Sequence, residues 1–164
     1  MSIGDTALSE AILFYTKRIF DISTTGEKLS NDEWQQPLFT YIMTKKQFNR
    51  LNVLCQQNGW PRQTCSGIIF SARDIQHVIT ARTGKDSLTW QEVADILNAS
   101  YCVRSVVAVN KGRNKQAVVL NSVTNIHVRG QKYYGLAIIQ ISENNLAPVT
   151  AYHATKAKIE AILK

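Results

Sequence analysis

The sequence predicts an α+β fold, in which N-terminal helices are followed by a four-stranded antiparallel β-meander and a short C-terminal helix. Over the first hundred of the 164 residues, apolar side chains recur at the three- and four-residue spacing of amphipathic helices. After residue 100 they alternate with polar side chains, as strands do. Short turn sequences connect these strands, so strands that follow each other in the chain are expected to pair antiparallel. Helices followed by such a meander are typical of the α+β class.

Two helical regions are expected in the first sixty residues. Apolar side chains follow helical spacing through residues 7–21 and again through residues 32–57. Pro37 interrupts or ends the first part of the second region, because proline cannot continue a helix. Gly59 and Pro61 close that region and mark the main internal boundary of the chain, since glycine suits a helix C-terminus.

Two shorter helices are expected next. Ser71 can cap a helix over residues 72–82, and Thr83-Gly84 would end it. The sequence Thr89-Trp-Gln-Glu92 is a capping-box pattern, in which the first and last side chains bond each other's backbone N–H groups. It predicts a helix over residues 90–98.

The rest of the chain predicts strands, which cover residues 101–110, 115–121, 133–142 and 149–153. The basic sequence Lys111-Gly112-Arg113-Asn114 is the expected first hairpin turn, and Glu143-Asn144-Asn145 is the expected last one. The start of the third strand stays open, because it can begin as early as Asn125. Residues 155–163 are expected to form a terminal helix.

Positive charge is concentrated in the later part of the chain. Residues 1–40 hold 3 Lys/Arg and 6 Asp/Glu, whereas residues 41–164 hold 16 and 6, so net charges of −3 and +10 sum to +7. A basic surface attracts polyanions, which favours nucleic acid as a partner. The same part contains His77, His127 and His153, and imidazole both gives and takes protons near neutral pH. Of the three, His127 is the weakest catalytic candidate.

Several classes of protein and site are disfavoured. The three cysteines are an odd number without CxxC spacing, which argues against a disulfide framework or a cysteine-ligated zinc site. No apolar run approaches the roughly 20 residues of a membrane span, and the first residues lack a signal-peptide pattern. Glu143 and Glu160 are the sole acidic residues after position 100, too few for a magnesium-binding cluster. We expect neither a metal nor a cofactor.

The helix expected over residues 72–82 carries candidate catalytic and RNA-binding residues. Arg73 and His77 are four positions apart and share one face, and Arg82 follows five residues later. A cation beside the imidazole disfavours its charged form, which suits a general base, and an arginine can hold a phosphate. The alternative is that His77 is a hydrogen-bonded residue at the edge of the core and Arg73 a solvated surface charge.

The last expected strand carries a second set of candidates. Its two-residue period puts Thr150 and Tyr152 on one face and Val149, Ala151 and His153 on the other. We expect the Val149 face to pack on the helices, which leaves Thr150 and Tyr152 on an open polar face where a substrate can lie. His153 ends the strand and can turn either way. Threonine and tyrosine are also common strand formers, so a purely structural role is the alternative.

Basic turn residues form a third set. Lys111, Arg113 and Lys115 belong to one expected hairpin, and Arg129 and Lys132 lie in another loop. Such loops can grip phosphates, and a cation near a scissile phosphate stabilises the charge that develops during cleavage. Solvated turn charges are the alternative.

Two stretches, Ser71-Ala-Arg-Asp-Ile-Gln-His77 and Val149-Thr-Ala-Tyr-His153, fall on a helix and on the last strand of this expected arrangement. With them, residues 68–164 resemble the Barnase–EndoU–colicin D–RelE-like (BECR) ribonuclease superfamily, found in bacterial polymorphic toxins and phage nuclease domains. The resemblance implies catalytic groups on the first helix and on the sheet face, although no acidic general base accompanies the sheet here. The residues that it implicates are His77, Thr150, Tyr152 and His153.

We therefore expect a metal-independent ribonuclease toxin that cleaves RNA, with tRNA as a candidate target, through attack by the 2′-hydroxyl group. Residues 68–164 would be the ribonuclease domain, and residues 1–60 a helical segment for entering a cell, for delivery or for partner binding. RNA and a cognate immunity or antitoxin protein are the expected partners. The expected site of action is the bacterial cytoplasm, reached from another cell or by a phage. The alternatives are a non-catalytic basic nucleic-acid-binding module and a phage- or toxin-associated protein-interaction domain.

Overall fold

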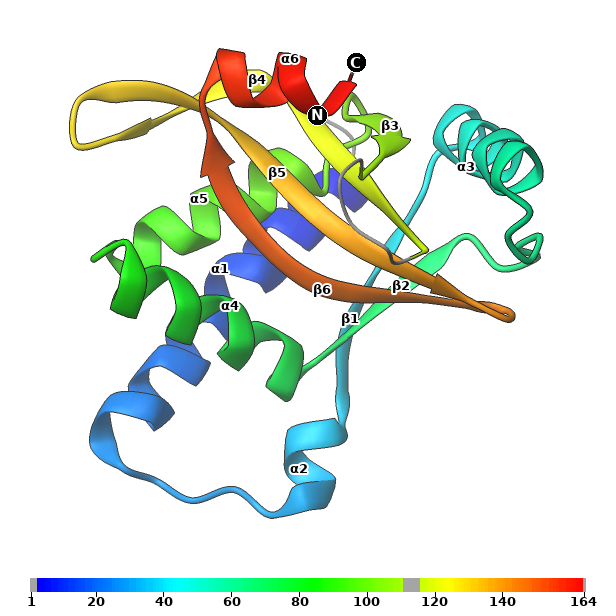
Figure 1. Ribbon diagram of the computed structural model, residues 1–164. Helices are drawn as coiled ribbons and strands as arrows, with labels where there is room; N and C mark the ends of the chain where they lie inside the picture. The colour runs from blue at the N-terminus through cyan, green and yellow to red at the C-terminus, as the bar shows by residue number, and fades with distance from the viewer. Residues whose placement is uncertain (1–2, 111–115, 164) are drawn as a thin grey trace.

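The structure, a computed structural model, describes residues 3–110 and 116–163 and confirms the α+β class (Figure 1). Strands β3 to β6 form an antiparallel sheet in the order β3-β4-β5-β6, preceded by helices and followed by a short helix. The helices are α1 (Ile3–Thr25), α2 (Asn31–Gln35), α3 (Lys45–Asn58), α4 (Ala72–Lys85), α5 (Trp90–Ser100) and α6 (Lys156–Leu163). The strands are β1 (Pro37–Ile42), β2 (Gly67–Ser71), β3 (Val106–Val109), β4 (Ala117–Val128), β5 (Gln131–Ser142) and β6 (Asn145–Ala154).

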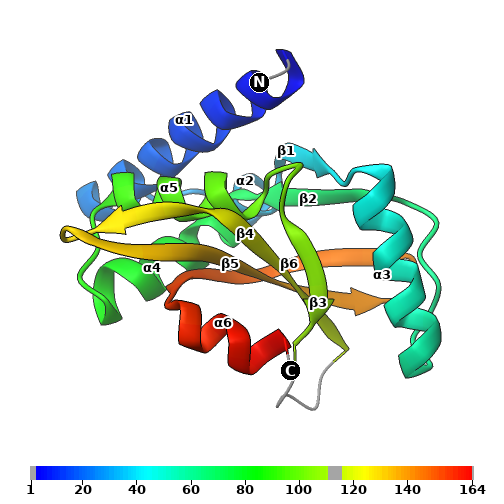
Figure 2. The ribbon, with the colours of Figure 1, turned by 90° about the horizontal axis from the view of Figure 1, so that it is seen from above.

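Helices pack on both faces of the four-stranded sheet (Figure 2). α1, α4 and α5 lie on one face, and α6 lies on the other. Successive strand residues point to opposite faces, so the neighbours Val118 and Val119 belong to two different apolar clusters. Val118 packs in the main core under α5, whereas Val119 packs with Ile159 and Ile162 of α6. Within the described residues, none of the helices has the length and apolar character of a membrane span.

A small second sheet replaces part of the helical region expected over residues 32–57. That expectation is wrong, because the region forms α2, β1 and α3, and β1 pairs antiparallel with β2. Gln36 is extended before Pro37, as the residue before a proline tends to be. The aromatic and β-branched residues that follow favour a strand. Their pairing partner, β2, is remote in sequence and was not expected.

The first sixty residues share the core of the rest of the chain. Ile12 and Ile19 of α1 and Leu51 of α3 are buried in the same apolar cluster as Ile75 of α4 and Val118 of β4. α1 packs against α4 and α5, on the side of these helices that faces away from the sheet (Figure 2). The N-terminal segment is therefore part of one continuous hydrophobic core.

Most helix ends follow the expected capping residues. Ser71 and Thr89 each form a capping box with the acidic residue three positions later. Gly59 ends α3 in the left-handed conformation, with a φ of 69°, where a residue without a Cβ atom is favoured. α1 and α5 are longer than the expected residues 7–21 and 90–98.

α4 continues past Thr83-Gly84, so the end expected there is wrong. The helix runs to Lys85. Asp86 then caps it, because its backbone N–H donates to the carbonyl oxygen of Arg82, and its carboxylate lies 2.6 Å from the Arg82 guanidinium. One i,i+4 ion pair thus stabilises the last turn.

Three strand boundaries differ from the expected ones. β3 begins at Val106 rather than residue 101, because the Ser105 hydroxyl donates to the carbonyl oxygens of Ala99 and Ser100 and closes a turn after α5. β4 continues to Val128, so Asn125 belongs to the second strand of the meander and not to the third. β6 is also longer than expected and begins at Asn145.

The helices approach the sheet most closely at Gly135 of β5. A Cβ atom added there would lie 2.7 Å from the Ser100 hydroxyl and 2.9 Å from the Ile96 carbonyl oxygen, both on α5. No side chain fits in this space, since backbone atoms on both elements would have to move. Gly135 therefore sets the distance between α5 and β5.

We predict that Gly135→Ala lowers the free energy of unfolding by about 1–3 kcal/mol, the usual cost of overpacking a core. Gly84→Ala is the control: a Cβ atom there meets nothing within 4 Å. It should raise stability by up to about 1 kcal/mol, because alanine favours helix. Urea denaturation measures both. Equal stability of the two variants would mean that α5 does not approach β5 this closely.

Candidate functional site

α4 lies beside β6, one of the two edge strands of the sheet (Figure 1). Ile75 and Ile79 are buried on one face of α4, and Arg82 follows on that face one turn later. Its side chain is thereby brought to β6. We call the polar side chains of this region the α4–β6 cluster, which consists of Arg82, Asp86, Tyr133, Thr150, Tyr152 and His153.

Arg82 is the cation of the α4–β6 cluster. Its guanidinium pairs with Asp86 at 2.6 Å, and the two side chains are 16% and 29% exposed. The guanidinium carbon also lies 5.8 Å from the centre of the Tyr152 ring, within cation–π range. The expected RNA-binding residue Arg82 is therefore held by Asp86 next to a side chain that the sequence implicates in catalysis.

His153 is the imidazole of the cluster. Gly135 lies directly opposite it on β5, and opposite residues of an antiparallel pair point to the same face. His153 therefore points to the face that α1, α4 and α5 cover. The sequence alone left this orientation open. Its ring meets the Tyr133 ring edge-on, with centroids 4.7 Å apart and planes at 83°. This contact fixes the plane of the imidazole.

Thr150 and Tyr152 lie on the other face of β6, as expected, but that face is not open. Tyr152 packs against the apolar cluster that contains Ile159 and Ile162 of α6, and the Thr150 hydroxyl oxygen is buried. The expected open platform at these residues is therefore wrong. The terminal helix covers it, which the sequence pattern of the strand alone could not reveal.

The position of Val149 also differs from the expected one. Ile138 pairs with Thr150 and Ile139 with Pro148, so Val149 is the extra residue of a β-bulge. It is exposed and does not pack on the helices. The alternation predicted for Ala151 and His153 holds, because both follow the bulge.

Unpartnered polar atoms are concentrated in this cluster. Six buried side-chain nitrogen or oxygen atoms have no hydrogen-bond partner within the described chain, and three of them are Arg82 Nε, Thr150 Oγ1 and His153 Nδ1. Buried polar atoms are nearly always paired, so an unpaired group needs an explanation.

His77 and Arg73 are exposed and stand apart from these side chains. Five residues separate His77 from Arg82, which places them about 140° apart around the axis of α4. His77 makes no hydrogen bond, ion pair or ring contact with the part of the chain that the structure describes. The structure thus brings Arg82 together with Tyr152, the neighbour of His153 in β6, and leaves His77 and Arg73 on another, solvent-facing side of the helix.

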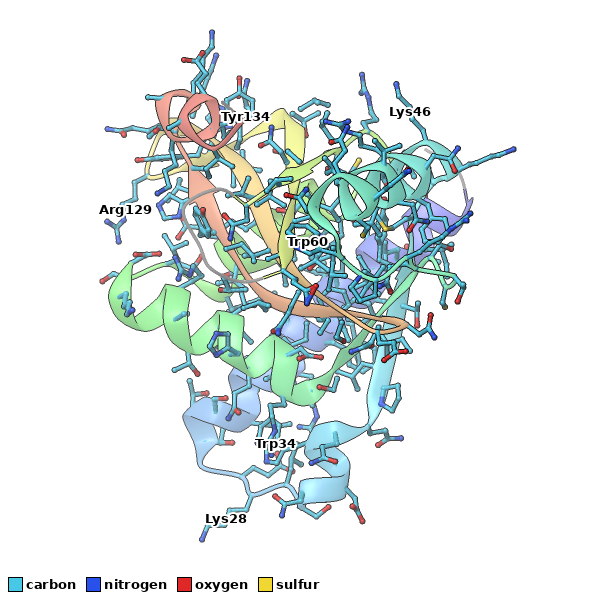
Figure 3. The ribbon with its side chains drawn as sticks, turned by 45° about the vertical axis from the view of Figure 1, so that its right-hand side comes forward. Lys28, Trp34, Lys46, Trp60, Arg129 and Tyr134 are labelled. Carbon is cyan, nitrogen blue, oxygen red and sulfur yellow. The ribbon has the colours of Figure 1, made fainter. Side chains whose placement is uncertain are left out.

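Of the expected basic loops, the structure describes one. Lys111, Arg113 and Lys115 lie outside the described residues. Arg129 is not a free phosphate-binding group, because its guanidinium donates to the carbonyl oxygens of Asp86 and Ser87 at 2.8 and 3.0 Å. It ties the β4–β5 hairpin to the end of α4 (Figure 3).

Two members of the cluster, Asp86 and Tyr133, were missed in the sequence. The four-residue spacing from Arg82 to Asp86 is a detectable signal for a helical ion pair. Tyr133 had no such signal, because its contact with His153 depends on the register between β5 and β6. Cross-strand register is set by the whole sheet and not by local sequence.

His127 lines a different cavity, of about 800 Å³, between α1, α5 and β4. Asp95 and Arg104 also line it. Desolvation raises the pKa of the Asp95 carboxyl above its ordinary value, and the negative charge of Glu92 adds to the shift. The cavity has one residue of each charge beside an exposed imidazole, but it contains none of the other candidate catalytic residues.

No group of three or more histidine, cysteine or acidic side chains that could hold a metal ion occurs among residues 3–110 and 116–163. Comparisons with protein families, with curated proteins and with solved structures find no match to this chain. What can be inferred about its activity therefore depends on its own residues.

We predict that Asp86→Asn lowers the free energy of unfolding by roughly 1–3 kcal/mol, because it leaves the mostly buried Arg82 charge without its partner. Asp21→Asn is the matched control. It breaks an i,i+4 pair with Lys17, but both side chains there are about half exposed, at 45% and 58%. Its effect should stay below about 0.5 kcal/mol. Chemical denaturation measures both, and equal losses would show that Asp86 does not hold a buried charge.

Proposed function

We propose that this protein is a metal-independent ribonuclease that acts as a toxin, with RNA bound across α4 and β6. The observation that carries the proposal is the α4–β6 cluster, which contains a cation, an imidazole and three hydroxyl groups, and in which three buried polar atoms lack hydrogen-bond partners. A buried polar group without a partner needs an explanation, and a catalytic role is one. The BECR resemblance of residues 68–164 implicates three of the same residues, Thr150, Tyr152 and His153.

The proposed chemistry uses the RNA itself as the nucleophile. The 2′-hydroxyl oxygen attacks the adjacent phosphorus and loses its proton to a general base, while the bond from phosphorus to the 5′-oxygen breaks and a general acid protonates that oxygen. The products are a 2′,3′-cyclic phosphate and a 5′-hydroxyl end. His153 carries one of the two protons in this proposal, and His77 is the candidate for the other.

The remaining residues of the proposal bind and position the RNA. Arg82, held by Asp86, supplies positive charge beside Tyr152. Such a charge stabilises the negative charge that develops on the phosphate. Arg73 is exposed on α4 and can contact a neighbouring phosphate. Thr150 and Tyr152 have an indirect role in the proposal: they hold the end of β6, which carries His153, in position.

The charge distribution supports a polyanionic substrate. Residues 41–164 carry a net charge of +10, and this part contains both α4 and β6. RNA is favoured over DNA because the proposed attack needs a 2′-hydroxyl group, and tRNA is the proposed target class. A toxin of this kind requires a cognate immunity or antitoxin protein, and it would act in the bacterial cytoplasm.

We predict that the purified protein cleaves total tRNA in the presence of EDTA and leaves 2′,3′-cyclic phosphate ends. The mechanism needs a base, an acid and cations, and all three are present as side chains. Gel electrophoresis with end-group analysis measures the products. If folded protein binds RNA in EDTA but leaves it intact, the protein is a non-catalytic nucleic-acid-binding module, which is the second candidate.

Single histidine variants test the assignment of the protons. His153→Gln and His77→Ala should each slow cleavage by roughly a hundredfold to ten-thousandfold, the usual contribution of a general acid or base. Each should also relieve toxicity when the protein is expressed. His127→Ala is the control, because His127 lines a different cavity and should keep full activity. Circular dichroism verifies folding, and full activity of either test variant would remove that histidine from the mechanism.

A further inference from the structure

A groove of about 960 Å³ lies between α3 and the loop that follows it. We call it the α3 groove. Aromatic rings, amide groups and an arginine line it, from Phe48, Asn49, Asn52, Gln56, Trp60 and Arg62. It belongs to the first part of the chain, outside residues 71–77 and 149–153 that carry the ribonuclease resemblance.

The loop wall of this groove is held firmly in place. The Asn52 side chain donates to the carbonyl oxygen of Gln63 at 3.1 Å and accepts from its N–H group at 2.9 Å. The Gln63 side chain donates to the carbonyl oxygen of Ser142 at the end of β5. Trp60 is anchored through its backbone N–H, which donates to the carbonyl oxygen of Cys55 in α3 at 2.8 Å. The groove is therefore preorganised and not a gap between mobile segments.

One buried polar atom in the groove wall lacks a partner. Gln63 is 1% exposed, lines the groove, and its side-chain oxygen finds no hydrogen-bond donor within the described residues. Asn49 and Gln56, both exposed on α3, also make no hydrogen bond to that part of the protein. The groove thus offers two free amide groups, which suits a ligand rich in hydrogen-bonding edges.

α3 and the loop after it carry positive charge. α3 carries Lys45, Lys46 and Arg50 and no acidic residue, and Arg62 adds a fourth cation. None of the four forms an ion pair with the described part of the chain. In Figure 3, Lys46 projects outward from the α3 side of the molecule, and Trp60 lies between α3 and the sheet.

We infer that the α3 groove binds a single-stranded polynucleotide. Trp60 offers a ring on which a base can stack, and the amide groups of Asn49 and Gln56 can pair with base edges. Arg62 and Lys46 can neutralise the phosphates on either side. An acidic protein would use the cations but would leave the amide groups and the ring without a function, which is why a polynucleotide fits better. The inference does not depend on cleavage at the α4–β6 cluster.

The test measures binding of a fluorescein-labelled single-stranded DNA of about 12 nucleotides by fluorescence anisotropy, in EDTA. DNA lacks the 2′-hydroxyl group, so binding is measured without cleavage. Two matched pairs of variants compare the groove with the opposite end of the molecule, where Figure 3 shows Lys28 and Trp34. The pairs are Lys46→Ala with Lys28→Ala, and Trp60→Leu with Trp34→Leu. Both tryptophans are partly buried against the core, so the second pair also controls for folding.

We expect Trp60→Leu to weaken binding about tenfold, and Lys46→Ala and Arg62→Ala to weaken it several-fold each, with a shallower salt dependence. Lys28→Ala and Trp34→Leu should stay within about twofold of the parent protein. Arg62→Ala keeps the test valid if Trp60→Leu fails to fold. The inference would be overturned if the protein failed to bind the DNA at low salt, or if the Lys46 and Arg62 variants bound it as tightly as the parent protein. Equal losses of affinity in both members of each pair would also overturn it. RNA cleavage with no such binding would also overturn it and leave the ribonuclease proposal intact.

Discussion

The close approach of α5 to β5 at Gly135 is the constraint on which the arrangement of the helices depends. The Ser100 hydroxyl and the Ile96 carbonyl oxygen occupy the space that any side chain at position 135 would need. On the strand side, the Gly135 N–H group donates to the Ser122 hydroxyl at 2.8 Å, so this part of the sheet is fixed as well. α1 packs on α4 and α5, and α4 contacts both α5 and β6.

A second set of contacts holds the end of α4 in place at the α4–β6 cluster. Asp86 holds the Arg82 guanidinium, and Arg129 ties the β4–β5 hairpin to the carbonyl groups just after α4. Together they fix the end of the helix beside β6. The side chains of Tyr152 and His153 point to opposite faces of that strand, yet α4 contacts its edge, where both faces are within reach. Polar residues that are distant in sequence therefore meet at one junction.

Short sequence patterns predicted much of this fold, but they could not predict contacts between residues that are distant in the chain. The caps at Ser71, Thr89 and Gly59 depend on a few neighbouring residues, and the structure confirms all three. The β1–β2 pair was missed because each strand is stabilised by a partner remote in the chain. The same holds for the site. Arg82 was recognised from its helix, but the packing of Tyr152 against the cluster that includes α6 and the ring contact of His153 depend on tertiary structure.

The three histidines can report directly on RNA binding at the junction of α4 and β6, which we propose above. His153 lies in the α4–β6 cluster, His77 on the adjoining face of α4, and His127 in a separate cavity. The decisive measurement is a titration of the imidazole NMR signals with a 2′-O-methyl RNA, which cannot be cleaved. The account predicts that the signals of His153 and His77 shift on binding while those of His127 stay in place. A shift confined to His127, or RNA binding that moves none of the three, would contradict it.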